Sequence, residues 1–243
     1  MRKAKLTVRV ILTAGAVVAL AGCGTATHGV AGASKERCAS RAPTGSTAWA
    51  AVVTEPLTAF RRPGHGAIAR FGLLNVNGVD TVFGVLDETC RATWLRVQLP
   101  LRPNGVTGWV RADHVRQVRV RARIVVDLSE RRVRFYENGR LRLQSPAAIG
   151  SPATPTPLGR YYVNQRLIPS DTHGPFGPGA IGISAFSPVL TGWAQGGPVA
   201  IHGTDEPWSI GRAVSNGCIR VPNAVLRRLF PRTPSGTPVL IRR

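Results

Sequence analysis

Residues 124–144 read IVVDLSERRVRFYENGRLRLQ, the clearest strand pattern in the second half of the chain. An apolar run at 124–128 ends in a turn, and the chain returns through alternating apolar and polar residues from 132 onward. Asn138-Gly139 is the next turn, because both residues tolerate a positive φ. Such alternation predicts an antiparallel hairpin with one face in the core and the other in water.

Short apolar runs broken by turns continue on both sides of this hairpin. The 243 residues are 43% hydrophobic and 18% charged, and they include 27 Gly and 19 Pro. This composition predicts a globular, mainly β chain with many short strands. The one helix that we expect is PNAVLRRLF, residues 222–230, because Pro suits a first helical turn and its leucines form one apolar face. A final strand, TPVLIRR, is expected over 237–243.

The chain is strongly basic, with 32 Lys+Arg against 12 Asp+Glu and a formal net charge of +20. Nearly all of these cations are arginines, which is typical of GC-rich coding. We therefore attribute the excess positive charge first to coding composition rather than to a function. The only sustained apolar run lies near the N-terminus. This excludes a polytopic membrane protein.

The N-terminal residues 1–22 have the pattern of a lipoprotein signal peptide: a basic leader and a short apolar stretch before Leu20-Ala21-Gly22-Cys23. These four residues resemble the lipobox of bacterial lipoproteins, which implies a lipid on Cys23; the alternative is an ordinary secretory signal. Residues 23–46 are small and polar and are expected to form a flexible tether.

Removal of residues 1–22 takes away four cations and no acid, which lowers the net charge to +16. We expect an exported protein, lipid-anchored on the outer face of the cytoplasmic membrane and facing the cell wall. A basic protein held there meets the membrane and anionic wall polymers rather than nucleic acid.

Export also changes how the four cysteines are interpreted, since disulfides persist outside the cytoplasm. With Cys23 lipidated, three cysteines remain, and we predict a disulfide between Cys38 and Cys90. The alternative is two unpaired structural thiols. Cys218 is then the odd, free cysteine.

Residues 47–118 contain short alternating runs, and the stretch from Trp94 through Trp109 resembles the last strands of a bacterial SH3-like wall domain. The two tryptophans are either part of a ligand platform or, more commonly, part of the core.

Two motifs of the second half carry chemistry: IHGT at 201–204 and SNGCIR at 215–220. A thiol becomes a good nucleophile at neutral pH when a neighbouring histidine favours its thiolate, so His202 and Cys218 form a candidate pair. The alternative is a structural cysteine beside a core histidine. One Cys and one His at this spacing cannot fill a tetrahedral zinc site, so we expect no metal and no cofactor.

Residues around the thiol fit the same chemistry. Gly217 lets the backbone come close, so its amide and that of Cys218 are candidate donors to an oxyanion. Arg220 lies two residues beyond the thiol, where it would lower the pKa of Cys218 or hold a substrate carboxylate.

These motifs, together with GSPATPTPLGRYYV at 150–163 and the opening hairpin, resemble the L,D-transpeptidase catalytic domain of the YkuD type. The resemblance covers residues 120–243. It implies a mainly β fold, in which a small SH3-like barrel precedes a β-sandwich-type catalytic domain with one or two short helices. It also implies that a glycine-containing lid lies within 170–188.

The resemblance assigns a role to each matching position. Cys218 would be the nucleophile, His202 the general base and acid, and the carbonyl of Gly203 would orient the imidazole. The remaining matches would shape the loop, serve the oxyanion or contact substrate, and they are Ser215, Asn216, Gly217 and Arg220. Many family members have histidine where this chain has Asn216.

The implied activity is cross-linking of peptidoglycan stem peptides. The thiolate attacks the third residue of a tetrapeptide stem, D-alanine leaves, and an amine of a neighbouring stem resolves the thioester as a 3→3 cross-link. Two alternatives stay open: an L,D-carboxypeptidase that uses water, and a non-catalytic wall-binding lipoprotein. A cysteine endopeptidase of the NlpC/P60 kind is disfavoured, because there the Cys precedes the His in the chain.

Overall fold

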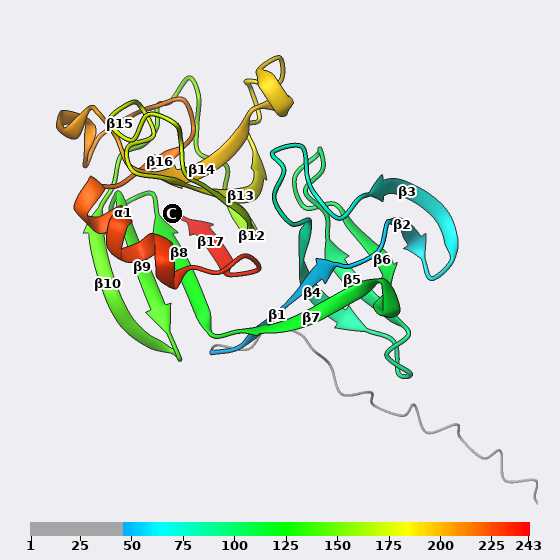
Figure 1. The fold of residues 1–243 in the computed structure, drawn as a ribbon. Coiled ribbons are helices and arrows are strands. Elements are labelled where there is room, and N and C mark those ends of the chain that lie inside the picture. The colour runs from blue at the N-terminus through cyan, green and yellow to red at the C-terminus, as the bar shows by residue number, and fades with distance from the viewer. Residues whose placement is uncertain (1–45) are drawn as a thin grey trace, which may run out of the picture. The chain divides into compact units, whose positions relative to one another are not determined.

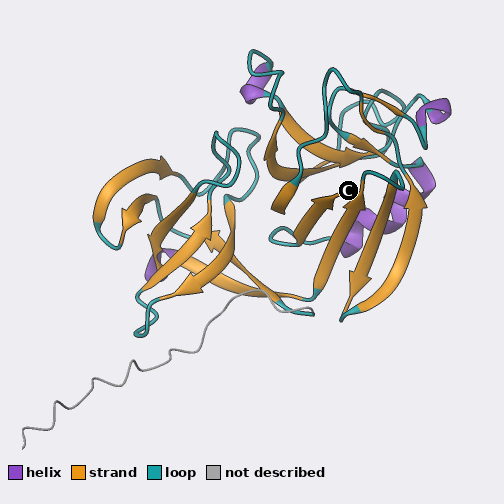
Figure 2. Ribbon diagram, turned by 180° about the vertical axis from the view of Figure 1, so that it is seen from behind, coloured by secondary structure: helices purple, strands orange, loops and turns teal. Residues whose placement is uncertain are grey.

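The computed structural model describes residues 46–243 (Figure 1). The predicted signal peptide, Cys23, Cys38 and the predicted tether up to residue 45 lie outside the described residues. The described part is mainly β, as the sequence predicts, and its strands form two large sheets (Figure 2). None of its helices has the length and hydrophobicity that crossing a bilayer requires.

Seven antiparallel strands form the first sheet, in the order β3-β2-β6-β5-β4-β1-β7. Phe83, Leu95 and Leu99 are fully buried in its core. Trp94 and Trp109 are only partly buried, and Trp94 lies edge-on to Phe60, with 5.8 Å between the ring centroids. The assignment of this sheet to the SH3-like class stays a prediction. The strands are β1 (Ala48–Val53), β2 (Leu57–Arg62), β3 (His65–Phe71), β4 (Val82–Glu88), β5 (Trp94–Gln98), β6 (Thr107–Arg111) and β7 (Val115–Val120).

Eight strands form the second sheet, in the order β10-β9-β8-β17-β12-β13-β14-β16. Two neighbouring pairs are parallel, β8 with β17 and β14 with β16, and the other pairs are antiparallel. These strands are β8 (Ala122–Asp127), β9 (Arg132–Glu137), β10 (Arg140–Pro146), β12 (Gly159–Leu167), β13 (Ala180–Phe186), β14 (Pro198–His202), β16 (Ile219–Arg220) and β17 (Pro238–Arg242).

The remaining elements are short. A two-stranded sheet joins β11 (Ile149–Gly150) in parallel to β15 (Ala213–Ser215). The one α-helix of the described residues is α1 (Asn223–Leu229). Four 3-10 turns complete the inventory: η1 (Ala112–His114), η2 (Ala194–Gly196), η3 (Pro207–Ser209) and η4 (Phe230–Arg232).

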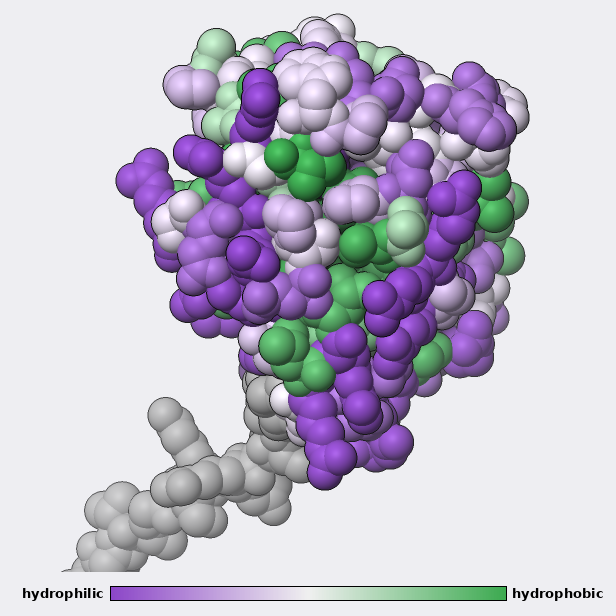
Figure 3. Space-filling view, turned by 90° about the vertical axis from the view of Figure 1, so that its left-hand side faces the viewer, coloured by the Kyte–Doolittle hydropathy of each residue, from purple (hydrophilic) through white to green (hydrophobic). Residues whose placement is uncertain are grey.

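The hairpin and the helix form where the sequence predicts them. β8, β9 and β10 follow one another in antiparallel order, and Asn138 and Gly139 have φ values of 51° and 76° in the turn between β9 and β10. Helix α1 buries Leu226 and Leu229 completely, as its apolar face requires. Exposed and buried residues alternate in β10 from Arg142 to Pro146, and hydrophilic residues cover much of the surface on this side (Figure 3).

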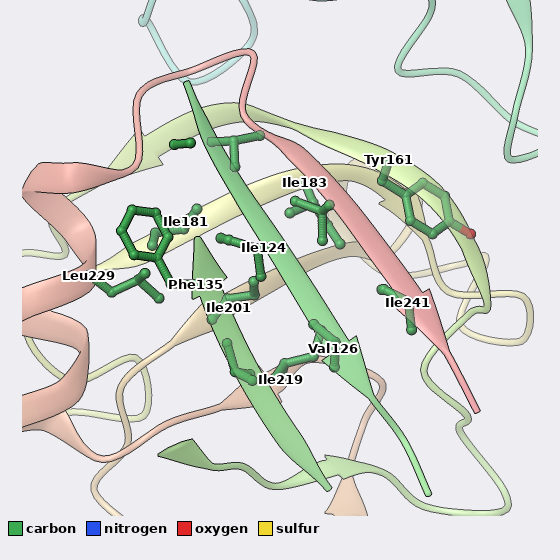
Figure 4. Packing of buried hydrophobic residues seen from close by; sticks show 14 of the residues in the cluster. Ile124, Val126, Phe135, Tyr161, Ile181, Ile183, Ile201, Ile219, Leu229 and Ile241 are labelled. Carbon is green, nitrogen blue, oxygen red and sulfur yellow. The ribbon is translucent and has the colours of Figure 1, made fainter. Parts of the chain in front are cut away.

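The core of the second sheet lies between two curved halves of the sheet. Ile124 and Val126 of β8 face Ile181 and Ile183 of β13 and Ile201 of β14 (Figure 4). The C-terminal strand β17 is central rather than marginal, since it pairs with β8 on one side and β12 on the other. β14 ends beside this core at His202, one of the two candidate catalytic residues.

The first sheet contributes to the same core. Ala48, Ala50 and Val120 belong to the buried cluster of the second sheet. The side chain of Asn104 also bonds the backbone of Phe186 twice, accepting from the amide at 2.8 Å and donating to the carbonyl at 2.8 Å.

One cysteine of the first sheet is oxidised. Cys90 lies in the turn between β4 and β5 and is disulfide-bonded. Its partner lies outside the described residues, so its pairing with Cys38 stays a prediction.

Candidate active site

Two parallel strands bring the histidine and cysteine motifs together. β14 and β16 lie side by side (Figure 1). In their parallel register Ile201 lies opposite Ile219, and His202 lies opposite Arg220. Cys218 immediately precedes β16 and accepts a hydrogen bond from the backbone amide of Ala200 on β14. Cys218 is a free, partly buried thiol.

The imidazole of His202 is held by the backbone. His202 is buried, with 4% of its surface exposed, and its Nδ1 lies 2.6 Å from the carbonyl oxygen of Gly203. The Phe176 ring packs edge-on against the imidazole, with 5.0 Å between the ring centroids. A carbonyl on Nδ1 leaves Nε2 as the nitrogen without the proton, and a general base needs that form.

The loop before the thiol is tied by Ser215. Its Oγ donates to the carbonyl of Cys218 at 2.5 Å and accepts from the amide of Gly217 at 3.2 Å. Gly217 has a φ of 107°, a conformation that favours glycine. Because its amide is bound to Ser215, Gly217 is not free to donate to an oxyanion in this structure, contrary to expectation. The amide of Cys218 remains the candidate donor, and Asn216 is exposed.

Two threonines of the proline-containing loop support the thiol loop, a role that their sequence context alone does not predict. Thr156 Oγ1 donates to the carbonyl of Gly217 at 2.9 Å and accepts from the amide of Gly150 at 2.8 Å. Thr154 Oγ1 donates to the carbonyl of Ser215 at 2.9 Å. The only signal was that these residues lie within the quoted TPTP segment.

Asn223, at the start of α1, holds the segment that follows His202. Its Oδ1 accepts from the amide of Thr204 at 2.8 Å, and its Nδ2 donates to the carbonyl of Thr204 at 3.0 Å. A Cβ on Gly203 would lie 2.2 Å from that Oδ1, so only glycine fits at this position. No sequence motif points to Asn223.

Arg220 forms an ion pair with Glu206, and only 18% of its side chain is exposed. Its positive charge acts on both members of the candidate pair, lowering the pKa of Cys218 and of His202. The side chain therefore has a partner within the chain before any substrate carboxylate arrives.

The predicted lid is only partly a loop. Residues 180–186 form the largely buried strand β13, so the mobile-loop interpretation of 170–188 is wrong for these residues. The remaining loop before β13 carries His173, whose side chain is 94% exposed. Trp193 and Trp208 are also more than half exposed.

The family model described as the L,D-transpeptidase catalytic domain, YkuD, matches residues 121–241. Residues 121–241 match the YkuD family. The YkuD-like domain thus comprises the second sheet, α1 and the candidate pair.

No group of three or more His, Cys, Asp or Glu residues within 46–243 is arranged to hold a metal ion.

Relatives agree with this match. The putative L,D-transpeptidase YkuD of Bacillus licheniformis is 39% identical over 120 residues, which cover 49% of this chain and 64% of that protein. Its namesake in Bacillus subtilis is 35% identical over 121 residues, covering 49% of this chain and 65% of the relative. The chain thus spans slightly less than two thirds of the length of these relatives.

A solved structure is also similar. The catalytic domain of an Enterococcus faecium L,D-transpeptidase is 29% identical, and the overlay covers 49% of this chain and 95% of that one with a TM-score of 0.37.

Burial sets the protonation of the candidate pair in the YkuD-like domain. Desolvation lowers the pKa of His202 to about 4, and the positive charge of Arg220 acts in the same direction. Desolvation also raises the pKa of the Cys218 thiol, against the opposing effects of the Ala200 amide and Arg220. At neutral pH both groups are therefore uncharged, so any attack by the sulfur requires a base that accepts the thiol proton.

This resting state predicts how alkylation of Cys218 depends on pH. Because the thiol pKa is raised, the labelling rate with iodoacetamide should increase about tenfold per pH unit between pH 6 and 8. Peptide mass spectrometry after short exposures measures this rate at Cys218 alone. Arg220→Gln should slow labelling at pH 8, because it removes a charge that favours the thiolate. A rate that is already constant from pH 6 would instead indicate a preformed thiolate–imidazolium pair.

The low pKa of His202 also predicts a pH-dependent stability. The unfolded chain gives this histidine a pKa near 6.5 and the folded chain one of about 4, so the unfolded state binds more protons between these values. The stabilisation is complete above pH 6.5 and is lost as the pH falls toward 4. The free energy of unfolding should therefore drop by about 2 kcal/mol from this group between pH 7 and 5.

Urea denaturation at both pH values measures this change. In His202→Gln the same drop should be smaller by about 2 kcal/mol, because the variant has no titrating group at this position. An identical pH dependence in the two proteins would contradict the low pKa.

Proposed function

We propose that this protein is a peptidoglycan L,D-transpeptidase that forms 3→3 cross-links through a thioester on Cys218. The observation that carries the proposal is the pairing of β14 with β16, which places the free thiol beside the strand of a buried histidine whose Nδ1 faces the Gly203 carbonyl. The match of residues 121–241 to the YkuD family supports the same reaction class.

Acylation begins with neutral partners. His202 takes the thiol proton as the sulfur of Cys218 attacks the carbonyl carbon of the third stem residue. The negative charge that develops on the carbonyl oxygen is met by the amide of Cys218. The bond to the terminal D-alanine then breaks, His202 returns the proton to the departing amine, and the acyl group remains on sulfur as a thioester.

Transfer reverses these proton movements. The side-chain amine of a second stem attacks the thioester carbonyl and gives a proton to His202. The carbon–sulfur bond breaks, an amide forms between the two stems, and the proton returns to Cys218. One amide is exchanged for another, so the reaction needs no cofactor.

The setting of this reaction is also part of the proposal. The lipobox-like sequence ending in Cys23 supports a lipid anchor on the outer face of the cytoplasmic membrane. The small, polar residues 23–46 would form a flexible tether that lets the folded domains extend from the membrane to the cell wall. The positive charge suits a place among anionic wall polymers. The first sheet would serve as an SH3-like module that spaces or docks the YkuD-like domain.

Mass spectrometry of the full chain incubated with purified disaccharide-tetrapeptide tests the proposal. We expect a dimer that is lighter than two monomers by one D-alanine, with no such product from Cys218→Ala. Tripeptide without dimer would indicate an L,D-carboxypeptidase, in which water resolves the same thioester. Absence of both products over several stem chemistries would favour a non-catalytic wall-binding protein.

A further inference from the structure

A cavity of about 250 Å³ lies apart from the candidate active site. Its walls come from β1 and β4 of the first sheet and from β8, β9, β12 and β17 of the second. Neither His202 nor Cys218 lines it. The volume corresponds to about eight water molecules, which suits a ligand of roughly ten non-hydrogen atoms.

The charge of the cavity has one sign. Three arginines line it, Arg121, Arg123 and Arg160, and none of its lining residues is acidic. Much of the rest of the wall is apolar, with aliphatic residues such as Leu86 and Leu240 beside several aromatic rings. A positive charge beside an apolar wall favours a ligand that combines an anionic group with an apolar body.

Arg123 is positioned for such a ligand. Its guanidinium lies 4.7 Å from the centre of the Tyr136 ring, which fixes the plane of the group. Its Nε is buried and has no hydrogen-bond partner in the described part of the chain. A buried donor without a partner is costly, so an acceptor entering the cavity gains affinity by satisfying it.

Tyr162 provides a second unsatisfied group in the same wall. The residue is 2% exposed, and its hydroxyl has no hydrogen-bond partner among residues 46–243. Burial raises the pKa of this phenol far above its ordinary value, so the hydroxyl remains a neutral donor. Gly84 makes room for the ring, because a Cβ there would lie 3.0 Å from Tyr162.

We propose that this cavity is a binding site for a small carboxylate with an apolar chain, held by Arg123 and Tyr162. The carboxylate accepts from the guanidinium and the phenol, and the chain lies along the aliphatic wall. The site is separate from the proposed transpeptidase reaction, and its occupancy is measured without turnover.

Isothermal titration of the full chain with octanoate tests the proposal. We expect saturable binding of one octanoate, with octanol and acetate each binding at least tenfold more weakly, because octanol lacks the charge and acetate lacks the chain. Arg123→Gln should weaken octanoate binding at least tenfold. Arg227→Gln removes the same charge from the exposed face of α1 and should change the dissociation constant less than twofold.

Tyr162→Phe keeps the test decisive if Arg123→Gln does not fold. It removes an unpartnered buried hydroxyl, so the variant should be at least as stable as the parent while binding octanoate several-fold more weakly. The proposal is overturned by a lack of saturable octanoate binding. The proposal is also overturned if octanol binds as tightly as octanoate, or if Arg123→Gln and Arg227→Gln change the octanoate dissociation constant equally. It is overturned likewise if Tyr162→Phe binds octanoate as tightly as the parent.

Discussion

Replacing His202 with glutamine should lower the rate of D-alanine release from a tetrapeptide stem by about 10³-fold, within the range found for a positioned general base. The reason is the protonation of the pair. Burial keeps the Cys218 thiol protonated at neutral pH, so attack requires a base that takes the proton as the carbon–sulfur bond forms. Glutamine has a similar length and hydrogen-bonds to the same backbone, but it cannot accept this proton.

Single-turnover release of D-alanine at pH 7.5 measures this loss. His65→Gln makes the same substitution at an exposed position on β3 and should leave the rate unchanged. A loss below tenfold in a folded His202→Gln protein would show that the thiol reacts without this base.

The second large effect is expected in stability. Thr156→Val should lower the free energy of unfolding by about 3 kcal/mol, because valine keeps the shape but leaves two buried backbone groups without their partner. These groups are the carbonyl of Gly217 and the amide of Gly150, 2.9 Å and 2.8 Å from the threonine hydroxyl. The same change frees the loop that carries Cys218, so D-alanine release should also fall.

Urea denaturation of both variants provides the comparison. Thr156→Ser keeps the hydroxyl and loses one methyl group, so it should cost only about 1 kcal/mol. If the valine variant were as stable as the serine variant, the hydroxyl would not be what holds the thiol loop.

Local pattern was enough to predict the elements. The alternation from Val133 to Leu143 predicts the hairpin of β9 and β10, and the apolar face of 222–230 predicts α1. The candidate pair of His202 and Cys218 was also predictable from the sequence, because thiol and imidazole side chains are uncommon and have few roles. The alternation in 180–186, however, lies within a glycine-containing segment that suggested a lid, whereas tertiary packing makes it a central strand.

A mainly β fold, the hairpin, the helix, and His202 and Cys218 as a candidate pair follow from the residues alone. Contacts between distant segments add that β17 is central, that Arg220 pairs with Glu206, that Ser215 binds the amide of Gly217, and that Thr156 supports the thiol loop. Periodicity records whether a residue faces the core or water. It does not record which distant strand lies alongside, because that depends on contacts between segments far apart in the chain.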